Sequence, residues 1–293
     1  TVDFGLFMSD LAPVFLERYV PASLELDQFP LNLQLRVTES DTRHNIYTNG
    51  KILKNEGVNW SVQFPKHFGG SCHFFHVSGN EFKTLESHYI SIDGRTVPIV
   101  IYGQSETQKA ALESAQSSLS KLEQLFGPYP HDKLLMYLAY PDDWGGGMEY
   151  CGAIKTSLFA ISHEIAHQWF GRGVLSSDGN SGWIDEAIAT WIDNRMPADS
   201  RACLTLQEPT NLANHSPFSR VTPLEAYSTG ARIMECIAGR LDAAKALSLT
   251  QVLRELVGEY KFRPLSTKAF QEFIQNKTSH NFESVFQTSV YGY

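Results

Sequence analysis

The hydrophobic period changes along this chain, and that change constrains the fold more than any other feature. Up to about residue 95, apolar and polar residues alternate in short runs such as Leu31–Val37 and Val58–Phe64. This two-residue period is typical of half-buried strands. From Ser105 onward, apolar residues recur three and four positions apart, which is the period of amphipathic helices. A sheet-forming segment followed by a run of helices predicts an α+β protein.

The length also favours two structural units, because 293 residues exceed the size of an ordinary single domain. We expect a partial β-sheet domain over residues 1–95 and a larger α+β domain over residues 96–293. The β-branched run Thr96–Tyr102 predicts a strand that leads into the second unit. Two further strands are expected there, over residues 133–140 and 151–156. Seven helices are expected, over residues 105–126, 157–170, 183–195, 223–241, 247–260, 267–275 and 282–290.

Composition excludes several classes of partner. Apolar residues make up 42% of the chain and charged residues 19%, and no apolar run is long enough to span a bilayer. The formal charge of -8 leaves no basic surface for nucleic acid or for an anionic membrane. We therefore expect neither a nucleic-acid partner nor a membrane span, and the sequence does not indicate an oligomeric state.

The cellular compartment stays open at this point. Cys72, Cys151, Cys203 and Cys236 form no CxxC pair, and they allow three disulfide pairings or free buried thiols. The chain starts at Thr1 without an initiator Met or a signal peptide, so we expect that an upstream segment has been removed.

The motif HEIAH, residues 163–167, predicts a metal site on a helix. His163 and His167 lie one turn apart on the same helix face, so both imidazoles can reach one zinc ion. Glu164 lies between them and can act as a general base on a zinc-activated water. A solvated helix with the same five letters is the alternative interpretation.

Glu186 is the expected third zinc ligand. It follows His167 by enough residues to finish one helix, turn through a glycine-rich loop and start another. Two imidazoles and one carboxylate leave the fourth position of a tetrahedral zinc open for water, which is typical of a catalytic site. We expect one Zn²⁺ per chain. The alternative is a surface carboxylate, but the surrounding Trp and Ala residues indicate burial.

Asp193 lies two helical turns after Glu186 on the same face. Its carboxylate could accept the second ring proton of a ligand histidine and fix the tautomer. A surface acid near the end of a helix is an equally good interpretation.

Three motifs resemble the gluzincin zinc aminopeptidases of the aminopeptidase N and leukotriene-hydrolase type. They are GGMEY at 146–150, HEIAHQWFG at 163–171 and WIDEAIATW at 183–191. The resemblance extends to residues 16–22 and 265–270. It implies a thermolysin-like zinc peptidase domain preceded by part of the family's N-terminal β-domain, without the front of that domain and without the C-terminal helical domain.

The resemblance also implies the substrate-binding residues. Gly146, Gly147, Met148 and Glu149 correspond to the family's GxMEN motif, and an extended peptide could pair with this exposed backbone. The carboxylate of Glu149 could bind the free α-amino group of a peptide, which would make the enzyme an exopeptidase. Tyr227 corresponds to the tyrosine that donates to the oxyanion of the intermediate.

Four positions depart from the family pattern, namely Tyr150, Arg172, Ala187 and Thr229. Side-chain preference at the substrate N-terminus therefore cannot be carried over. The intervals from Glu149 to His163 and from Glu186 to Tyr227 are shorter than usual, which predicts a more open cleft. Two alternatives to an aminopeptidase remain: a non-catalytic peptide-binding module that retains zinc, and a related zinc hydrolase such as an epoxide hydrolase.

Overall fold

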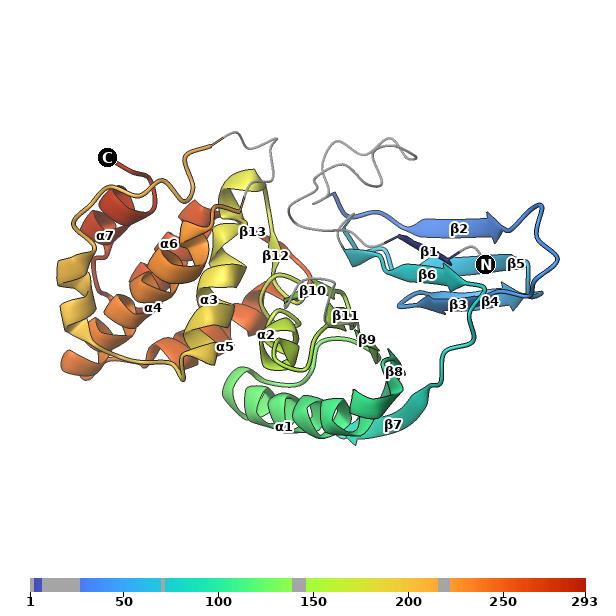
Figure 1. Cartoon of the computed structure of the whole chain (residues 1–293). Helices are drawn as coiled ribbons and strands as arrows, with labels where there is room; N and C mark the ends of the chain where they lie inside the picture. Colours follow the sequence, from blue (N-terminus) through green and yellow to red (C-terminus); the bar gives the residue numbers. More distant parts are fainter. Residues whose placement is uncertain (1–2, 7–26, 70–71, 139–145, 216–221) are drawn as a thin grey trace. The chain divides into compact units, whose positions relative to one another are not determined.

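The chain forms two compact units in the computed structural model, which describes all residues except 1–2, 7–26, 70–71, 139–145 and 216–221. The first unit holds residues 1–117 and 131–161, and the second holds residues 118–130 and 162–293. Strands precede helices along the chain, which confirms the α+β class (Figure 1). The segment 16–22 lies outside the described residues. The division into domains 1–95 and 96–293 stays a prediction.

The first unit contains two small antiparallel sheets within the described residues. One has the order β1-β6-β3, from Asp3–Leu6, Phe75–Ser78 and Asn45–Thr48, and the other has the order β2-β5-β4, from Leu31–Arg36, Asn59–Phe64 and Lys51–Asn55. Trp60, Val62 and Phe64 are buried on β5 while the residues between them are more exposed. The alternation that predicted strands at 31–37 and 58–64 is confirmed.

A five-stranded mixed sheet completes the first unit, in the order β10-β11-β9-β8-β7. The strands are β7 Leu85–Ile90, β8 Thr96–Gly103, β9 Leu134–Leu138, β10 Gly147–Tyr150 and β11 Ala153–Thr156. β8, β9 and β11 are parallel, and the two edge strands are antiparallel to their neighbours. β9 is buried at every position, as expected for a central strand.

The sequence indicates a glycine-rich turn between the expected strands at 133–140 and 151–156, but residues 147–150 of that interval form β10, and residues 139–145 lie outside the described residues. Residues 147–150 pair with β11 as a hairpin, and Gly152 makes the turn with a φ of +69°. Met148, Glu149 and Tyr150 are all buried in this strand. The glycines that indicated a turn instead provide the exposed start of an edge strand.

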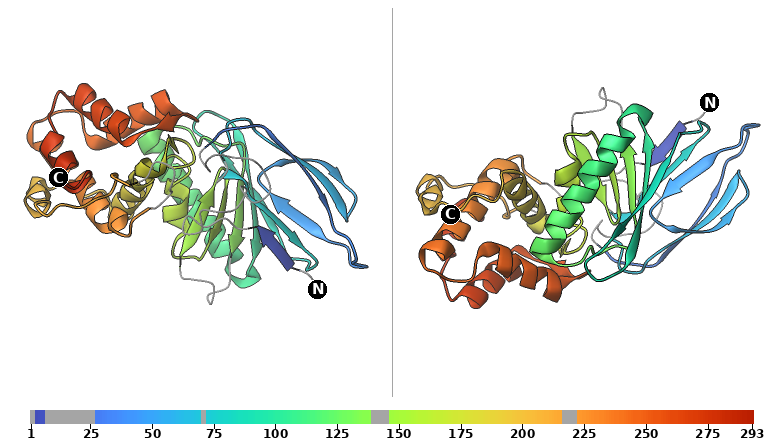
Figure 2. Two further views of the ribbon diagram at one scale, coloured as in Figure 1. Left: turned by 90° about the horizontal axis from the view of Figure 1, so that it is seen from above. Right: turned by 90° about the horizontal axis from the view of Figure 1, so that it is seen from below.

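A 3₁₀ turn at Ser105–Thr107 leads into α1, Gln108–Phe126. The first half of α1 lies along β7. The side-chain amide of Gln108 donates to the carbonyl of Lys83 at 2.7 Å, just before the strand, and that of Gln116 donates to the carbonyl of His88 at 3.3 Å. Figure 2 shows this helix against the sheet. Gly127, with a φ of +95°, ends the helix where the sequence predicts.

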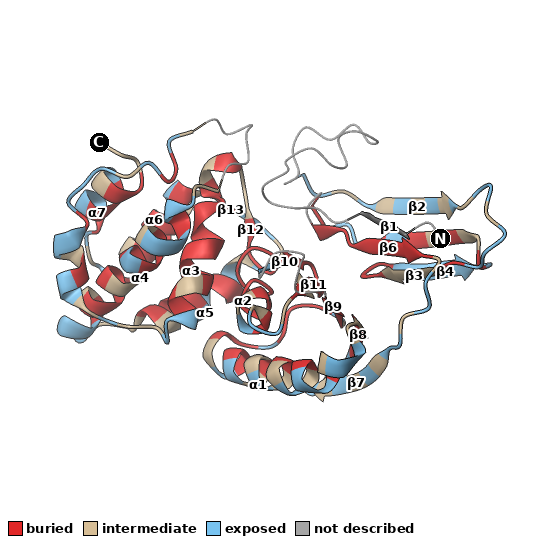
Figure 3. Cartoon of the chain, in the orientation of Figure 1, coloured by how far each residue is buried: buried red, intermediate tan, exposed pale blue. Residues whose placement is uncertain are grey.

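The second unit is built mainly from helices. Those after α1 are α2 Ile161–Ala166, α3 Trp183–Asp193, α4 Glu225–Ala243, α5 Leu249–Tyr260, α6 Thr267–Thr278 and α7 Glu283–Ser289, with 3₁₀ turns η4 Gly179–Ser181 and η5 Ser200–Thr205. Two short strands, β12 Leu175–Ser176 and β13 Pro264–Leu265, pair in parallel. α3 is buried along most of its length (Figure 3). The helices predicted from residue 183 onward are confirmed.

The helix predicted over residues 157–170 is shorter than expected. It begins at Ile161, after a turn, and its regular part ends at Ala166. The amide of His167 still bonds to the carbonyl four residues back at 3.2 Å, but the amides of Gln168 and Trp169 bond three residues back. This tightened last turn leads to Gly171, whose φ of +104° reverses the chain.

The four cysteines form two disulfides, each within one unit. Cys72 pairs with Cys151 in the first unit, and Cys203 pairs with Cys236 in the second. Cys203–Cys236 connects η5 to α4. Among the described residues, no helix has the length and the apolar character that a membrane span requires.

Candidate metal centre

His163, Glu164 and His167 are held by packing at the tightened end of α2. The two aromatic residues that follow them are buried against the end of α1. The indole of Trp169 donates to the carbonyl of Gly127 at 3.0 Å, and Phe170 packs edge-on against Phe126 with ring centroids 4.9 Å apart. The sequence HQWFG therefore anchors the histidine motif to the helix that precedes it.

α3, which carries Glu186, is anchored by tryptophans at both ends. The indole of Trp183 donates to Thr267 Oγ1 at 3.1 Å, and the indole of Trp191 donates to the carbonyl of Pro197 at 2.8 Å. Both rings are almost completely buried, so their N–H groups need these acceptors. Glu186 is thus presented in the first turn of a fixed helix.

Three potential ligand atoms converge between α2 and α3. His163 Nε2 lies 3.1 Å from Glu186 Oε2 and 3.1 Å from His167 Nε2, and His167 Nε2 lies 3.4 Å from Glu186 Oε2. The side chains of His167 and Glu186 are 1% and 5% exposed, and that of His163 is 18% exposed. The structure therefore brings His163, His167 and Glu186 together as a group that could hold a metal ion, with access from the side of His163.

The outer nitrogens of both rings have acceptors. His163 Nδ1 donates to Asp193 Oδ2 at 2.8 Å, and His167 Nδ1 donates to the carbonyl of Phe170 at 3.2 Å. Since each Nδ1 carries a proton, the Nε2 lone pairs of the neutral rings face the cluster. Asp193 lies where the sequence predicts. The carbonyl of Phe170 was not predicted, although the glycine that tightens this turn is visible in the sequence.

Without a metal, the cluster is an ion pair. Burial lowers the pKa of His163, but the hydrogen bonds to Asp193 and Glu186 outweigh burial and raise this pKa to about 9. Burial raises the pKa of Glu186, whereas the charges and hydrogen bonds of His167 and His163 hold it well below its ordinary value. A metal ion that binds here must therefore displace a proton from His163 at neutral pH.

Tyr227, near the start of α4, joins the cluster. Its hydroxyl donates to Glu186 Oε1 at 2.8 Å, and its ring stacks on that of His163 with centroids 6.2 Å apart. Tyr227 as a whole is 38% exposed. Glu164, one residue after His163 on α2, is buried.

The predicted substrate-binding residues lie in the first unit. Gly147, Met148 and Glu149 are on the edge strand β10, and Gly146 directly precedes it. The two glycines are exposed, whereas Met148 and Glu149 are buried, with Glu149 3% exposed and opposite Ile154 of β11.

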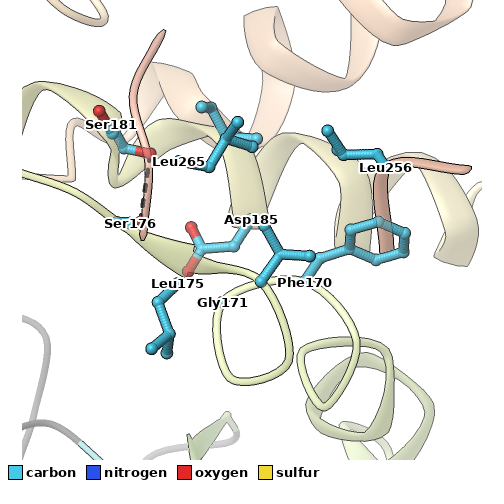
Figure 4. Close-up of a pocket in the computed structure, with 10 residues that line it drawn as sticks. Phe170, Gly171, Leu175, Ser176, Ser181, Asp185, Leu256 and Leu265 are labelled. Atoms are coloured by element: carbon cyan, nitrogen blue, oxygen red, sulfur yellow. Dashed lines mark hydrogen bonds between the residues drawn. The ribbon is translucent and has the colours of Figure 1, made fainter. Parts of the chain in front are cut away.

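A small pocket lies beside α3 and is lined by Phe170, Gly171, Val174, Leu175, Ser176, Ser181, Ile184, Asp185, Leu256 and Leu265 (Figure 4). None of these residues belongs to the cluster. A methyl group on Gly171 would lie 2.6 Å from Asp185 Oδ2, so the reversal after His167 packs directly on the start of α3. The pocket is therefore part of the packing that fixes α2 against α3.

Comparison with known proteins finds similarity to one peptidase family over part of this chain. Residues 154–289 match the peptidase family M1 domain. Aminopeptidase M1-D of Oryza sativa is 26% identical over 204 residues, covering 61% of this chain and 23% of the relative. Aminopeptidase 2 of Candida albicans is 33% identical over 127 residues, covering 36% and 14%. The chain thus spans less than a quarter of the length of either relative.

Solved structures share the fold. An M1 zinc metallopeptidase from Deinococcus radiodurans superposes with a TM-score of 0.66 at 19% identity, covering 90% of this chain and 64% of that one. Aminopeptidase A of Legionella pneumophila, in complex with aspartic acid, gives a TM-score of 0.65 at 14% identity, covering 90% and 35%. Residues 154–289, which contain His163, His167, Glu186 and Tyr227, are thus the part of the chain that is similar to peptidase family M1.

Proposed function

We propose that this protein is a zinc aminopeptidase, which hydrolyses the first peptide bond of peptides that have a free N-terminus. The observation that carries the proposal is the convergence of two imidazole nitrogens and one carboxylate oxygen beside the hydroxyl of Tyr227. The similar proteins are aminopeptidases and an M1 zinc metallopeptidase, which supports the same activity. One relative has been solved with a Tyr-Ser-Ala substrate.

The donor set fits zinc. Tetrahedral ligands about 2.0–2.1 Å from a zinc ion lie roughly 3.4 Å from one another. The three separations in the cluster are 3.1, 3.1 and 3.4 Å, so only small movements are needed. His163, His167 and Glu186 would hold one ion. Such an ion would polarise the scissile carbonyl and lower the pKa of a bound water to about 7.

Three side chains around the ion would transfer the proton, stabilise the oxyanion and orient a ligand. Glu164 accepts a proton from the attacking water and later delivers it to the leaving amine. Tyr227 donates a hydrogen bond from its hydroxyl to the developing oxyanion, a contribution of about 2.7–4 kcal/mol at comparable sites. Asp193 fixes the orientation of the His163 ring through its 2.8 Å hydrogen bond.

Glu149 would define the exopeptidase. We propose that its carboxylate pairs with the α-amino group of the substrate. The peptide would add along β10, the outermost strand of its sheet among the described residues, through main-chain hydrogen bonds, where Gly146 and Gly147 present no side chain to obstruct it.

The test combines metal analysis with a panel of aminoacyl-fluorophore substrates. We expect one zinc per chain, hydrolysis that chelators abolish, and retained zinc but no turnover in Glu164→Gln, because an amide cannot accept the proton. Glu259→Gln, an exposed site on α5, is the matched control and should behave as wild type. Zinc binding without turnover would favour a peptide-binding module, and turnover of epoxides alone would favour an epoxide hydrolase.

A second arm tests the amine anchor. Glu149→Ala should reduce hydrolysis of free peptides while leaving the zinc content unchanged. Equal hydrolysis of free and N-acetylated peptides by the wild type would exclude an exopeptidase.

A further inference from the structure

We propose that Gly230 is a positioning residue for Tyr227, because its lack of a side chain sets how closely α4 approaches α3. The catalytic consequence rests on the proposed function, since Tyr227 matters to turnover only if the cluster is an active site. The close contact between α4 and α3 at Gly230 does not depend on any activity.

At this point α4 and α3 pack too closely to leave room for a side chain on Gly230. A methyl group on Gly230 would lie 2.7 Å from Ala187 Cβ and 3.2 Å from Ala187 Cα. Carbon atoms normally approach to about 3.5–4.0 Å. A side chain at position 230 would therefore push α4 away from α3 by about 1 Å.

This contact lies one helical turn from the hydrogen bond of Tyr227. Tyr227 precedes Gly230 by three residues on α4, and Glu186 directly precedes Ala187 on α3. Residues three apart share one face of a helix, so the close contact and the hydroxyl face the same partner. Gly230 and Ala187 thus fix the separation across which Tyr227 reaches Glu186 at 2.8 Å.

A shift of about 1 Å would disrupt this interaction. The hydroxyl would move from 2.8 Å to beyond the range of an O–H···O hydrogen bond, which ends near 3.0 Å. In a catalytic site, a misplacement of that size can cost about 10²-fold in rate. The loss should appear in kcat, because Tyr227 acts on the oxyanion of the intermediate rather than on the bound substrate.

The central test compares Gly230→Ala, Tyr227→Phe and the variant with both changes. We expect Gly230→Ala to lower kcat by about 10- to 100-fold with KM unchanged. In the Tyr227→Phe background the same change should cost nothing further. Equal losses in both backgrounds would overturn the proposal, because Gly230 would then act independently of Tyr227.

Rescue provides the next test. Ala187→Gly removes the nearest carbon, so the atom nearest to a methyl group at position 230 becomes the Cα of residue 187, at 3.2 Å. Adding Ala187→Gly to Gly230→Ala should restore part of kcat, and no recovery would count against the contact. If Gly230→Ala alone fails to fold, the comparison with Tyr227→Phe is made in the Ala187→Gly background.

Two other glycines are matched controls. A methyl group on Gly258 of α5 would meet nothing within 4 Å, so Gly258→Ala should leave kcat unchanged. A methyl group on Gly239 of α4 would collide with the backbone of Asp199 and Ser200, three helical turns beyond Tyr227. Gly239→Ala should therefore lower stability while leaving kcat per folded molecule intact.

A measurement without substrate separates this inference from the proposed function. In protein labelled with ¹³Cζ-tyrosine, the resonance missing from Tyr227→Phe identifies Tyr227. That resonance should shift in Gly230→Ala and stay in place in Gly258→Ala. If the wild type hydrolyses nothing, the proposed function fails while the resonance still decides the role of Gly230. An unmoved resonance in folded Gly230→Ala would refute it.

Discussion

Replacing Asp193 with asparagine should weaken zinc binding, and the effect should be largest at alkaline pH. Asp193 Oδ2 accepts the Nδ1 proton of His163 at 2.8 Å, while His163 Nε2 faces the other ligands. An amide of the same shape keeps an acceptor but loses the negative charge that makes the imidazole a stronger donor to metal.

The expected magnitude is about tenfold. Loss of such an outer partner costs roughly 10–100-fold in metal affinity. The side chain of Asp193 is 36% exposed, and solvent screening places the effect at the lower end of that range. A tenfold loss corresponds to about 1.4 kcal/mol of binding free energy.

The pH dependence follows from the proton that zinc displaces. Burial lowers the pKa of His163, but Asp193 and Glu186 raise it to about 9 in the metal-free protein. Below that pH, zinc affinity should fall by about tenfold per pH unit through this one proton. Asp193→Asn lowers the pKa of His163, which reduces the competition from protons. At pH 6–7 the lost charge weakens zinc binding, whereas the weaker competition from protons at His163 strengthens it. The zinc affinity of the variant should therefore approach that of the wild type.

The assay is competition with a fluorescent zinc chelator from pH 6 to pH 9.5, with proton release measured by calorimetry in two buffers. The wild type should release about one proton from His163 per zinc at pH 7, and the variant should release less. Asp242→Asn, an exposed change on α4, is the control. Equal zinc affinities and equal proton release for variant and wild type across this range would refute the reasoning.

Two further predictions concern stability. The metal-free protein should become less stable as the pH rises from 6.5 to about 9, because the raised pKa of His163 adds stability below pH 6.5 that is lost as the proton leaves. The free energy of unfolding in urea should fall by at most about 3 kcal/mol over this range, and a flat pH profile would contradict the prediction. Replacing both Cys203 and Cys236 with serine should lower the free energy of unfolding by about 4 kcal/mol, because their disulfide closes a loop with a separation of 33 residues. An unchanged unfolding midpoint under oxidising conditions would count against this prediction.

Periodicity predicted the elements whose packing is regular. β2 and β5 alternate between more buried and more exposed residues, and α5 buries residues three and four apart, so their patterns are visible in the sequence. The pairing of His163 with His167 also follows from their spacing on one helix, whereas the approach of Glu186 depends on how α3 packs against α2.

Other features depend on tertiary contacts that carry no local signal. Gly146 and Gly147 indicate a turn in the sequence, whereas the strand character of residues 147–150 comes from pairing with β11. α2 was predicted too long, since residues 167–170 suit a helix but tighten to anchor Trp169 and Phe170. The cysteine pairs depend on which distant segments meet, and sequence spacing alone does not determine that.

The parallel pair β12–β13 has a consequence for the order in which the protein can mature. The loop between α2 and α3 is held in place by β13, where Pro264 and Leu265 pair with β12. Thr267 Oγ1 adds two hydrogen bonds, because it accepts from the indole of Trp183 and donates to the carbonyl of Asn180, which precede it by 84 and 87 residues. All three proposed metal ligands, His163, His167 and Glu186, leave the ribosome long before the segment that immobilises their loop. A nascent chain halted after α4 would carry every ligand and still lack a rigid site, so metal capture should be a late event in biogenesis.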